Sequence, residues 1–255
     1  MATASADLPY APRQGRALAA FSLIGWRWIS RNPASAIAPI LLPFIFLYFL
    51  HIISPAALFP VEILGAMLFT TQNIGGWVLG DSATWRIECA LQDLFVASPM
   101  GRIRYLFGVA FSNLMAAAPA LVVLGVLLAV VTPVPPLAWL VIAATLFVLW
   151  VLFSAIGVAM SSRVKSQRAI WPVNNLIFTV LGMLSPLYYP LSILPPWWQT
   201  AAHFLPSTYA ALLVQGAVGL TPESPATMLR YAGLLVGLAA VGIVLGLSVY
   251  RWREE

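Results

Sequence analysis

The sequence predicts an all-α integral membrane protein with six transmembrane helices, and its composition and charge distribution both indicate this class. Of the 255 residues, 61% are hydrophobic and only 8% are charged, against roughly 25% charged residues in ordinary soluble domains. Soluble globular enzymes, nucleic-acid-binding proteins and disordered chains need more polar side chains, so the composition excludes these classes. A membrane β-barrel would show short alternating segments, whereas this chain has long apolar runs.

The apolar runs are long enough for six helices, since a transmembrane helix needs about 20 predominantly apolar residues. Glu62 interrupts only the outer edge of the second run, and prolines at 133, 135 and 136 divide the long charge-free stretch 105–162 into two. Further prolines end the fifth run and precede the sixth. The predicted spans are 34–53, 61–80, 105–131, 137–160, 169–189 and 228–250.

The basic residues predict the orientation. Twelve of the 13 arginines and lysines fall before the first span, after the sixth, or in the two connections on that same side, and only Arg230 falls on the other. Because positive residues stay on the inner side of a membrane, we expect a multi-pass protein of the plasma (inner) membrane with both termini in the cytoplasm. No cleavable signal peptide is expected at the N-terminus.

The N-terminal region 1–33 is predicted to be a cytoplasmic tail that ends in an amphipathic helix at 12–31, and residues 34–255 form the six-span domain. Four arginines of this helix fall in one sector beside an apolar sector that contains Leu18, Phe21 and Trp28. Such a helix lies in the membrane interface. The alternative is an ordinary cytoplasmic helix before the first span.

Two more non-spanning segments are predicted. Residues 82–98 read as a short cytoplasmic amphipathic helix, capped by Asp81 or Ser82. It either binds a partner protein or merely joins two spans. Residues 190–227 carry no charge before Glu223 and are rich in tryptophan and proline, so we expect short helices that fold back into the outer leaflet.

The spans contain neutral polar residues but no visible catalytic group. Amides on the second and fifth spans are either interhelical contacts, which the composition favours, or the lining of a solute path. A P-loop is missing, so this chain does not hydrolyse ATP itself. One cysteine and two histidines provide no metal site, and no acidic residue lies mid-membrane as an ion-coupled carrier would need.

Two motifs give a family resemblance. The run Glu88-Cys-Ala-Leu-Gln-Asp-Leu-Phe-Val-Ala-Ser-Pro99 resembles an acidic residue, Gly-Thr-Leu-Glu-x-Leu and Ser-Pro in the permeases of type 2 ATP-binding-cassette exporters. The run Leu184-Ser-Pro-Leu-Tyr-Tyr-Pro-Leu-Ser-Ile-Leu-Pro195, with Leu205-Pro-Ser-Thr-Tyr209 after it, resembles their outer-loop motifs. This family includes daunorubicin-resistance and polysaccharide-export permeases.

The resemblance implies a function, partners and sites. The chain would be an exporter permease that moves an amphiphilic, drug-like or lipid-linked substrate outward. It would form a homodimer in the lipid membrane and assemble with two ABC ATPase subunits. These partner subunits would bind the ATP and Mg. The chain itself would not be an enzyme, bind nucleic acid or hold a metal or cofactor; the alternative is an ATP-independent secondary carrier or channel. The residues implied are, for coupling to the ATPase, Ile87, Glu88, Leu91, Leu94 and Ser98; for the substrate path, Gln72, Asn73, Gly76, Asn174, Asn175 and Phe178; and for the outer re-entrant region, Pro190, Leu194, Pro195, Trp197, Trp198, Pro206 and Tyr209.

The orientation predicts which positions an impermeant reagent reaches. In a Cys89→Ala background, Thr221→Cys should react with an impermeant maleimide added outside intact cells, because residue 221 is on the side with few basic residues. Ser166→Cys should react only after the cells are opened. Labelling of position 166 and protection of position 221 in intact cells would show that the chain has the opposite orientation.

Overall fold

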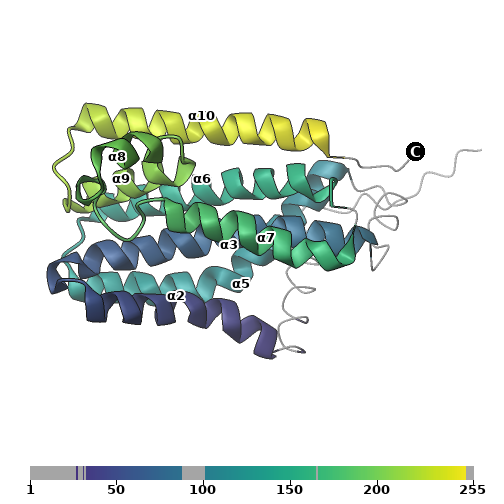
Figure 1. The fold of residues 1–255 in the computed structure, drawn as a ribbon, viewed down its shortest axis with the longest axis horizontal. Helices are drawn as coiled ribbons and strands as arrows, with labels where there is room; N and C mark the ends of the chain where they lie inside the picture. The colour runs from purple at the N-terminus through teal and green to yellow at the C-terminus, as the bar shows by residue number, and fades with distance from the viewer. Residues whose placement is uncertain (1–26, 28–30, 32, 88–100, 165, 251–255) are drawn as a thin grey trace, which may run out of the picture.

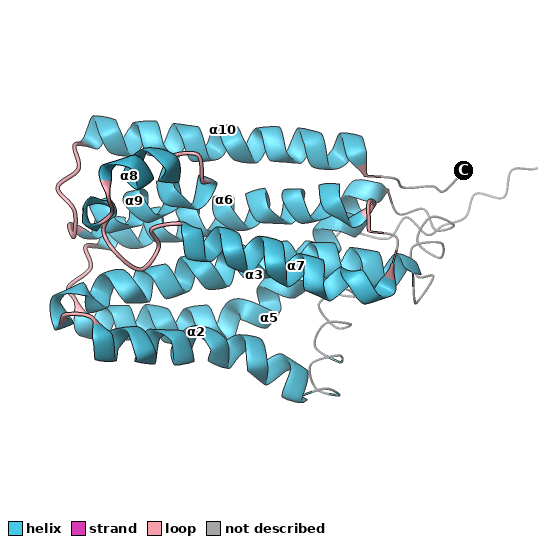
Figure 2. Cartoon of the chain, in the orientation of Figure 1, coloured by secondary structure: helices cyan, strands magenta, loops and turns pink. Residues whose placement is uncertain are grey.

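The computed structural model describes residues 27, 31, 33–87, 101–164 and 166–250, and these residues form a helical bundle (Figures 1 and 2). No strand occurs among them. Two short 3-10 helices, η1 (Ala56–Leu58) and η2 (Leu191–Ile193), accompany eight α-helices within the described ranges. The α-helices are α2 (Pro33–Ile53), α3 (Phe59–Ile87), α5 (Arg102–Val131), α6 (Pro136–Ser161), α7 (Gln167–Leu184), α8 (Pro196–Ala202), α9 (Pro206–Val218) and α10 (Pro225–Val249).

The long helices run along one axis and alternate in direction (Figure 1). Four segments are long and apolar enough to cross a membrane, namely Ala56–Ile87, Arg102–Val131, Pro136–Ser161 and Pro225–Val249. They coincide with the second, third, fourth and sixth predicted spans. Helices α2 and α7 occupy the places of the first and fifth. Neither is among these four, so the count of six spans stays a prediction.

Helix α3 lies in the middle of the bundle and contacts α2, α5, α6, α7 and α9. In the most apolar window of the Ala56–Ile87 segment, 72% of the residues are buried, against 22% for α5 and for α10. The most buried of the four candidate spans is also the least apolar, since α3 has the lowest mean hydropathy among them. Lipid is as apolar as a leucine side chain, so the polar helix is the one that gains from protein neighbours.

Glycines let α7 approach α3 closely. A methyl group on Gly76 would overlap the ring of Phe178, and one on Gly80 would come within 2.9 Å of Trp171. In the other direction, a methyl group on Gly182 would come within 2.7 Å of the ring of Phe69. Aromatic side chains of each helix therefore fill the positions where the other helix has no side chain, as expected of small residues at membrane helix contacts.

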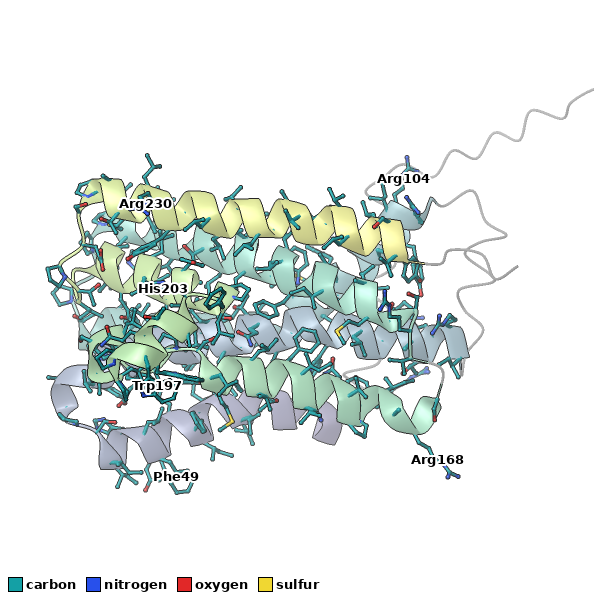
Figure 3. All side chains as sticks on the ribbon, turned by 45° about the horizontal axis from the view of Figure 1, so that its top comes forward. Phe49, Arg104, Arg168, Trp197, His203 and Arg230 are labelled. Atoms are coloured by element: carbon teal, nitrogen blue, oxygen red, sulfur yellow. The ribbon has the colours of Figure 1, made fainter. Side chains whose placement is uncertain are left out.

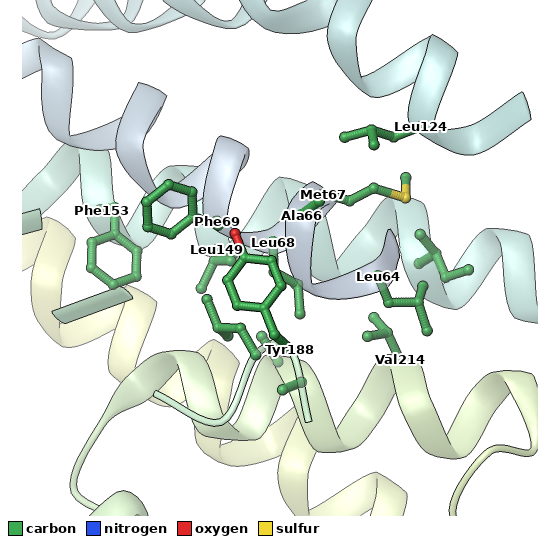
Figure 4. Packing of buried hydrophobic residues seen from close by; sticks show 14 of the residues in the cluster. Leu64, Ala66, Met67, Leu68, Phe69, Leu124, Leu149, Phe153, Tyr188 and Val214 are labelled. Carbon is green, nitrogen blue, oxygen red and sulfur yellow. The ribbon is translucent and has the colours of Figure 1, made fainter. Parts of the chain in front are cut away.

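The core extends from this contact to the end of the bundle that the charge distribution predicts to face outward, called the outer end from here on, with the opposite end called the inner end. Tyr188, in the connection after α7, lies against Phe69 at 6.1 Å and against Phe46 of α2 at 5.0 Å between ring centroids. Beyond it, Leu64 of α3 and Val214 of α9 belong to the same buried cluster (Figure 4). The short helix α9 thereby covers the outer half of α3.

Two predicted boundaries are wrong. The second span does not end near residue 80, because α3 continues without a break through Asp81 and Ser82 to Ile87. These residues cap no new helix, and the start of the predicted 82–98 helix belongs to α3. The fifth helix ends at Leu184 instead of residue 189, and the extended residue Ser185 terminates it. The rest of the 82–98 segment and the 12–31 helix, Arg27 and Arg31 apart, lie outside the described residues.

Candidate functional site

The candidate site is the contact between α3 and α7, where the six predicted path residues lie. The structure divides them into two groups. Gln72, Gly76, Asn174 and Phe178 are buried inside the bundle, whereas Asn73 is partly exposed and Asn175 is exposed. The two amides of α7 are neighbours in the sequence, and a helix turns by about 100° per residue, so they point to different surroundings.

Gln72 connects three helices. Its side-chain amide donates to the carbonyl of Phe178 on α7 at 3.0 Å, and its Oε1 accepts a hydrogen bond from the hydroxyl of Ser207 on α9 at 2.5 Å. The side chain is fully buried. A buried amide in a membrane protein is costly unless it is paired. Both ends of this one are paired within the chain, which is the arrangement expected of an interhelical contact.

The other three interior residues are equally enclosed. Phe178 has no exposed surface and packs its ring against Phe153 of α6, with 5.9 Å between centroids, and against Gly76. Asn174 is 1% exposed, and neither polar atom of its amide has a hydrogen-bond partner within the described part of the chain. These residues do not reach the surface of a single chain. No observation tests their predicted assignment to the path, and their burial favours a packing role instead.

Asn73 and Asn175 lie on the surface with two tryptophans that the path prediction left out. Trp77 and Trp171 meet edge to face across the two helices, with 6.2 Å between ring centroids. Asn73 is one turn before Trp77 and Asn175 is one turn after Trp171, so the antiparallel helices bring both amides to one level. We call Asn73, Trp77, Trp171 and Asn175 the amide–indole face.

The amide–indole face offers neutral hydrogen-bonding groups and aromatic surface. Asn73 donates one amide hydrogen to the carbonyl of Phe69 at 3.0 Å, and Trp171 is 41% exposed. The i, i+4 spacing of an amide and a tryptophan on both helices was a sequence signal for this surface. Spacing alone did not show which of the two amides of α7 is exposed, since that depends on where α3 packs.

At the inner end of α3, Arg86 holds the connection between α6 and α7. Its guanidinium donates to the carbonyls of Ser161 at 2.9 Å and Val164 at 2.8 Å, and more weakly to Ser162 at 3.4 Å. The carbonyls at the end of a helix lack partners within the helix and carry partial negative charge, so a cation is favourable there. Sequence reasoning missed this role, because the contact joins residues 75 to 78 positions apart.

Of the predicted coupling residues, the structure describes only Ile87. It is the last residue of α3, directly after Arg86, and it is 37% exposed. The others, Glu88, Leu91, Leu94 and Ser98, lie outside the described residues. The predicted coupling segment therefore begins directly after Arg86, which is hydrogen-bonded to the α6–α7 connection.

At the outer end, α8 and α9 form a compact turn. The hydroxyls of Thr208 and Tyr209 donate to the carbonyls of Ala202 and His203 at 2.6 and 2.7 Å. Prolines 190, 195 and 206 stand at the starts of η2, α8 and α9, and Leu194 ends η2. Trp197 is 69% exposed and contacts Trp198, with 5.3 Å between ring centroids. Figure 3 shows Trp197 and Arg230 at the end opposite Arg104 and Arg168.

Comparison with known proteins identifies related sequences. Residues 16–218 match the family described as ABC-2 type transporter. The inner membrane transport permease YadH of Escherichia coli strain K12 is 35% identical over 71 residues, and YadH of Shigella flexneri matches equally well. The aligned segment spans 28% of this chain and 28% of the length of each relative.

The hydrogen bonds of Gln72 predict a structural role. Gln72→Leu removes two contacts between helices and should lower the free energy of unfolding by about 1–2 kcal/mol, given roughly 0.6 kcal/mol for an average membrane hydrogen bond and up to about 1.7. Thermal melting of the purified protein measures this, with the exposed Asn175→Leu as a control that should melt as the wild type does. An unchanged melting temperature together with an altered substrate profile would place Gln72 on the path instead.

Proposed function

The chain belongs to the ABC-2 type transporter family, and on this premise we propose that it is the permease subunit of an ABC exporter, driven by ATP hydrolysis on a separate ATPase subunit. The family assignment covers about four-fifths of the chain and makes it a membrane component of an ABC transporter. The sequence has no P-loop, so the ATP and Mg would be bound by the partner. The name of the relatives supports a location in the inner membrane.

The amide–indole face carries the proposal of a solute path. Apart from arginines in their first turns, the large exposed side chains of α5 and α10 are aliphatic, aromatic or methionine, as expected of surfaces that contact lipid; examples are Val122, Val130, Leu229 and Val244. Asparagine amides are costly against lipid tails, so a surface with two of them faces something else. We infer that it faces a second copy of the chain, with the substrate between the two.

The chemistry of this face indicates the class of cargo. All four side chains are neutral, the amides can pair with a polar head group, and the two indoles can contact an aromatic or aliphatic body. An amphiphilic, drug-like or lipid-linked molecule combines these parts. We propose outward transport, from the basic end of the bundle, which is cytoplasmic by the positive-inside rule, towards α8 and α9. These short helices would then fold back into the outer leaflet.

Substitutions on this face should change substrate selection without affecting assembly. We expect Asn73→Leu and Asn175→Leu to alter the relative stimulation of ATPase activity across a panel of amphiphilic compounds in the reconstituted permease–ATPase complex. Asn174→Leu is the matched control, because it removes an amide next to Asn175 that points into the bundle. The variant should keep the substrate profile of the wild type. It should also retain the melting temperature, since the amide of Asn174 has no hydrogen-bond partner among the described residues. Wild-type substrate profiles for both Asn73→Leu and Asn175→Leu would show that the solute path does not run along this face.

The coupling segment predicts an interaction with the ATPase. Leu91→Asp or Glu88→Arg should weaken co-purification of the partner P-loop ATPase and uncouple transport, while the helices still insert. Thr221→Asp, at the opposite end, is the control and should co-purify like the wild type. Wild-type recovery of the ATPase by both variants, with normal transport, would contradict this role of the segment.

A further inference from the structure

A crevice of about 320 Å³ lies between α5, α6 and α10. Helix α5 packs mainly on α3, and α10 packs mainly on α6, so the crevice is the space left between these two pairs. The close contact of α10 with α6 limits its depth, since a methyl group on Gly246 would come within 2.8 Å of the carbonyl oxygen of Ala155. Its lining includes Phe107, Ala110, Trp150, Ser154, Ile243 and Leu247.

The crevice lies in the inner half of the bundle. Its lining residues belong to the first turns of α5, the last turns of α6 and the last two turns of α10. All three are at the end where Arg104 lies (Figure 3). The stretch of α6 from Trp150 to Val158 is about 12 Å long at 1.5 Å per residue, close to the roughly 15 Å hydrocarbon depth of one leaflet.

The walls of the crevice suit a hydrocarbon chain. Nearly all of its lining atoms are apolar, and the crevice reaches the lateral surface of the bundle, since Ile103 and Phe107 in its lining are 61% and 43% exposed. In a membrane, this opening faces lipid tails, not water. An apolar space of leaflet depth that is open at the side of the bundle is complementary to an acyl chain.

The inner rim of the crevice carries positive charge. Arg102 and Arg104 are exposed in the first turn of α5, on either side of Ile103, which lines the crevice. Among the described residues, no side chain caps this helix start at Gly101. Uncapped amides and two guanidinium groups at one helix start favour a phosphate. An anion at this rim would lie where the acyl chain of the same molecule enters the crevice.

We propose that the crevice binds an acyl chain of an anionic phospholipid from the cytoplasmic leaflet, with the lipid phosphate against Arg102 and Arg104. The lipid fills the space between α5 and the α6–α10 pair. The site lies at a helix contact other than the α3–α7 contact that carries the proposed path. It shares only the orientation of the bundle with the proposed function. Because lipid binding is measured without transport, failure of one proposal leaves the other intact.

Native mass spectrometry of the purified full chain tests the proposal with phosphatidylglycerol and phosphatidylcholine of equal acyl length. The wild type should retain phosphatidylglycerol about five-fold better or more, as expected from about 1 kcal/mol per arginine near anionic lipid. Ser154→Leu and Ala110→Leu fill the crevice and should lose the bound lipid. Ser248→Leu, an equal change on the exposed side of α10, should keep it.

Arginine variants test the head group separately. Arg104→Gln should reduce the preference for phosphatidylglycerol, whereas Arg168→Gln, at the same end but on α7, should not. Equal retention of the two lipids by the wild type would overturn the proposal. So would wild-type lipid binding by both crevice-filling variants. Disulfide cross-linking of Ile243→Cys between two copies in the Cys89→Ala background would also overturn it, by showing that protein covers the crevice.

Discussion

The cost of leaving a polar group unpaired in lipid governs the arrangement of this bundle. Helix α3 carries threonines, a glutamine, an asparagine and glycines in a span that must cross hydrocarbon, and the structure surrounds it with five other helices. Gln72 shows how the constraint is satisfied, since its amide is bonded to α7 and α9 at once. The more apolar helices α5 and α10 are left at the lipid boundary, because their side chains lose little there.

The two ends of the bundle depend on α3 as well. Its outer half is covered by α9, whose Ser207 reaches Gln72 and whose start is bonded to the end of α8. Its inner end carries Arg86, which holds the last carbonyls of α6 and the connection to α7. A displacement of α3 would therefore be felt at the outer turn and at the α6–α7 connection. This is a physical basis for linking events at the proposed coupling segment, which begins at Ile87, to both the α3–α7 contact and the outer end.

The exposed faces of the molecule differ in polarity, and this difference separates the surfaces that suit lipid from the surface proposed for the solute. Aliphatic rows on α5 and α10 suit lipid, and the crevice between these helices extends that apolar surface inward. The amide–indole face does not suit lipid. Family membership makes the chain a component of an ABC transporter, and this face is the surface on which a second subunit and a solute are proposed to meet.

The sequence determined the helical class, because 61% hydrophobic and 8% charged residues leave no soluble alternative. Prolines and charged residues also located the helices, most ends lying within three residues of those observed. Sequence reasoning placed a helix start at Ser82, where packing of α3 against α5 and α6 continues the helix to Ile87. Two features depend on helix packing. One is that Asn174 is buried while the adjacent Asn175 is exposed. The other is that Arg86 donates to carbonyls more than 70 residues away. Spacing along one helix gives the angle between two side chains, but only the positions of the neighbouring helices decide which of the two side chains faces protein.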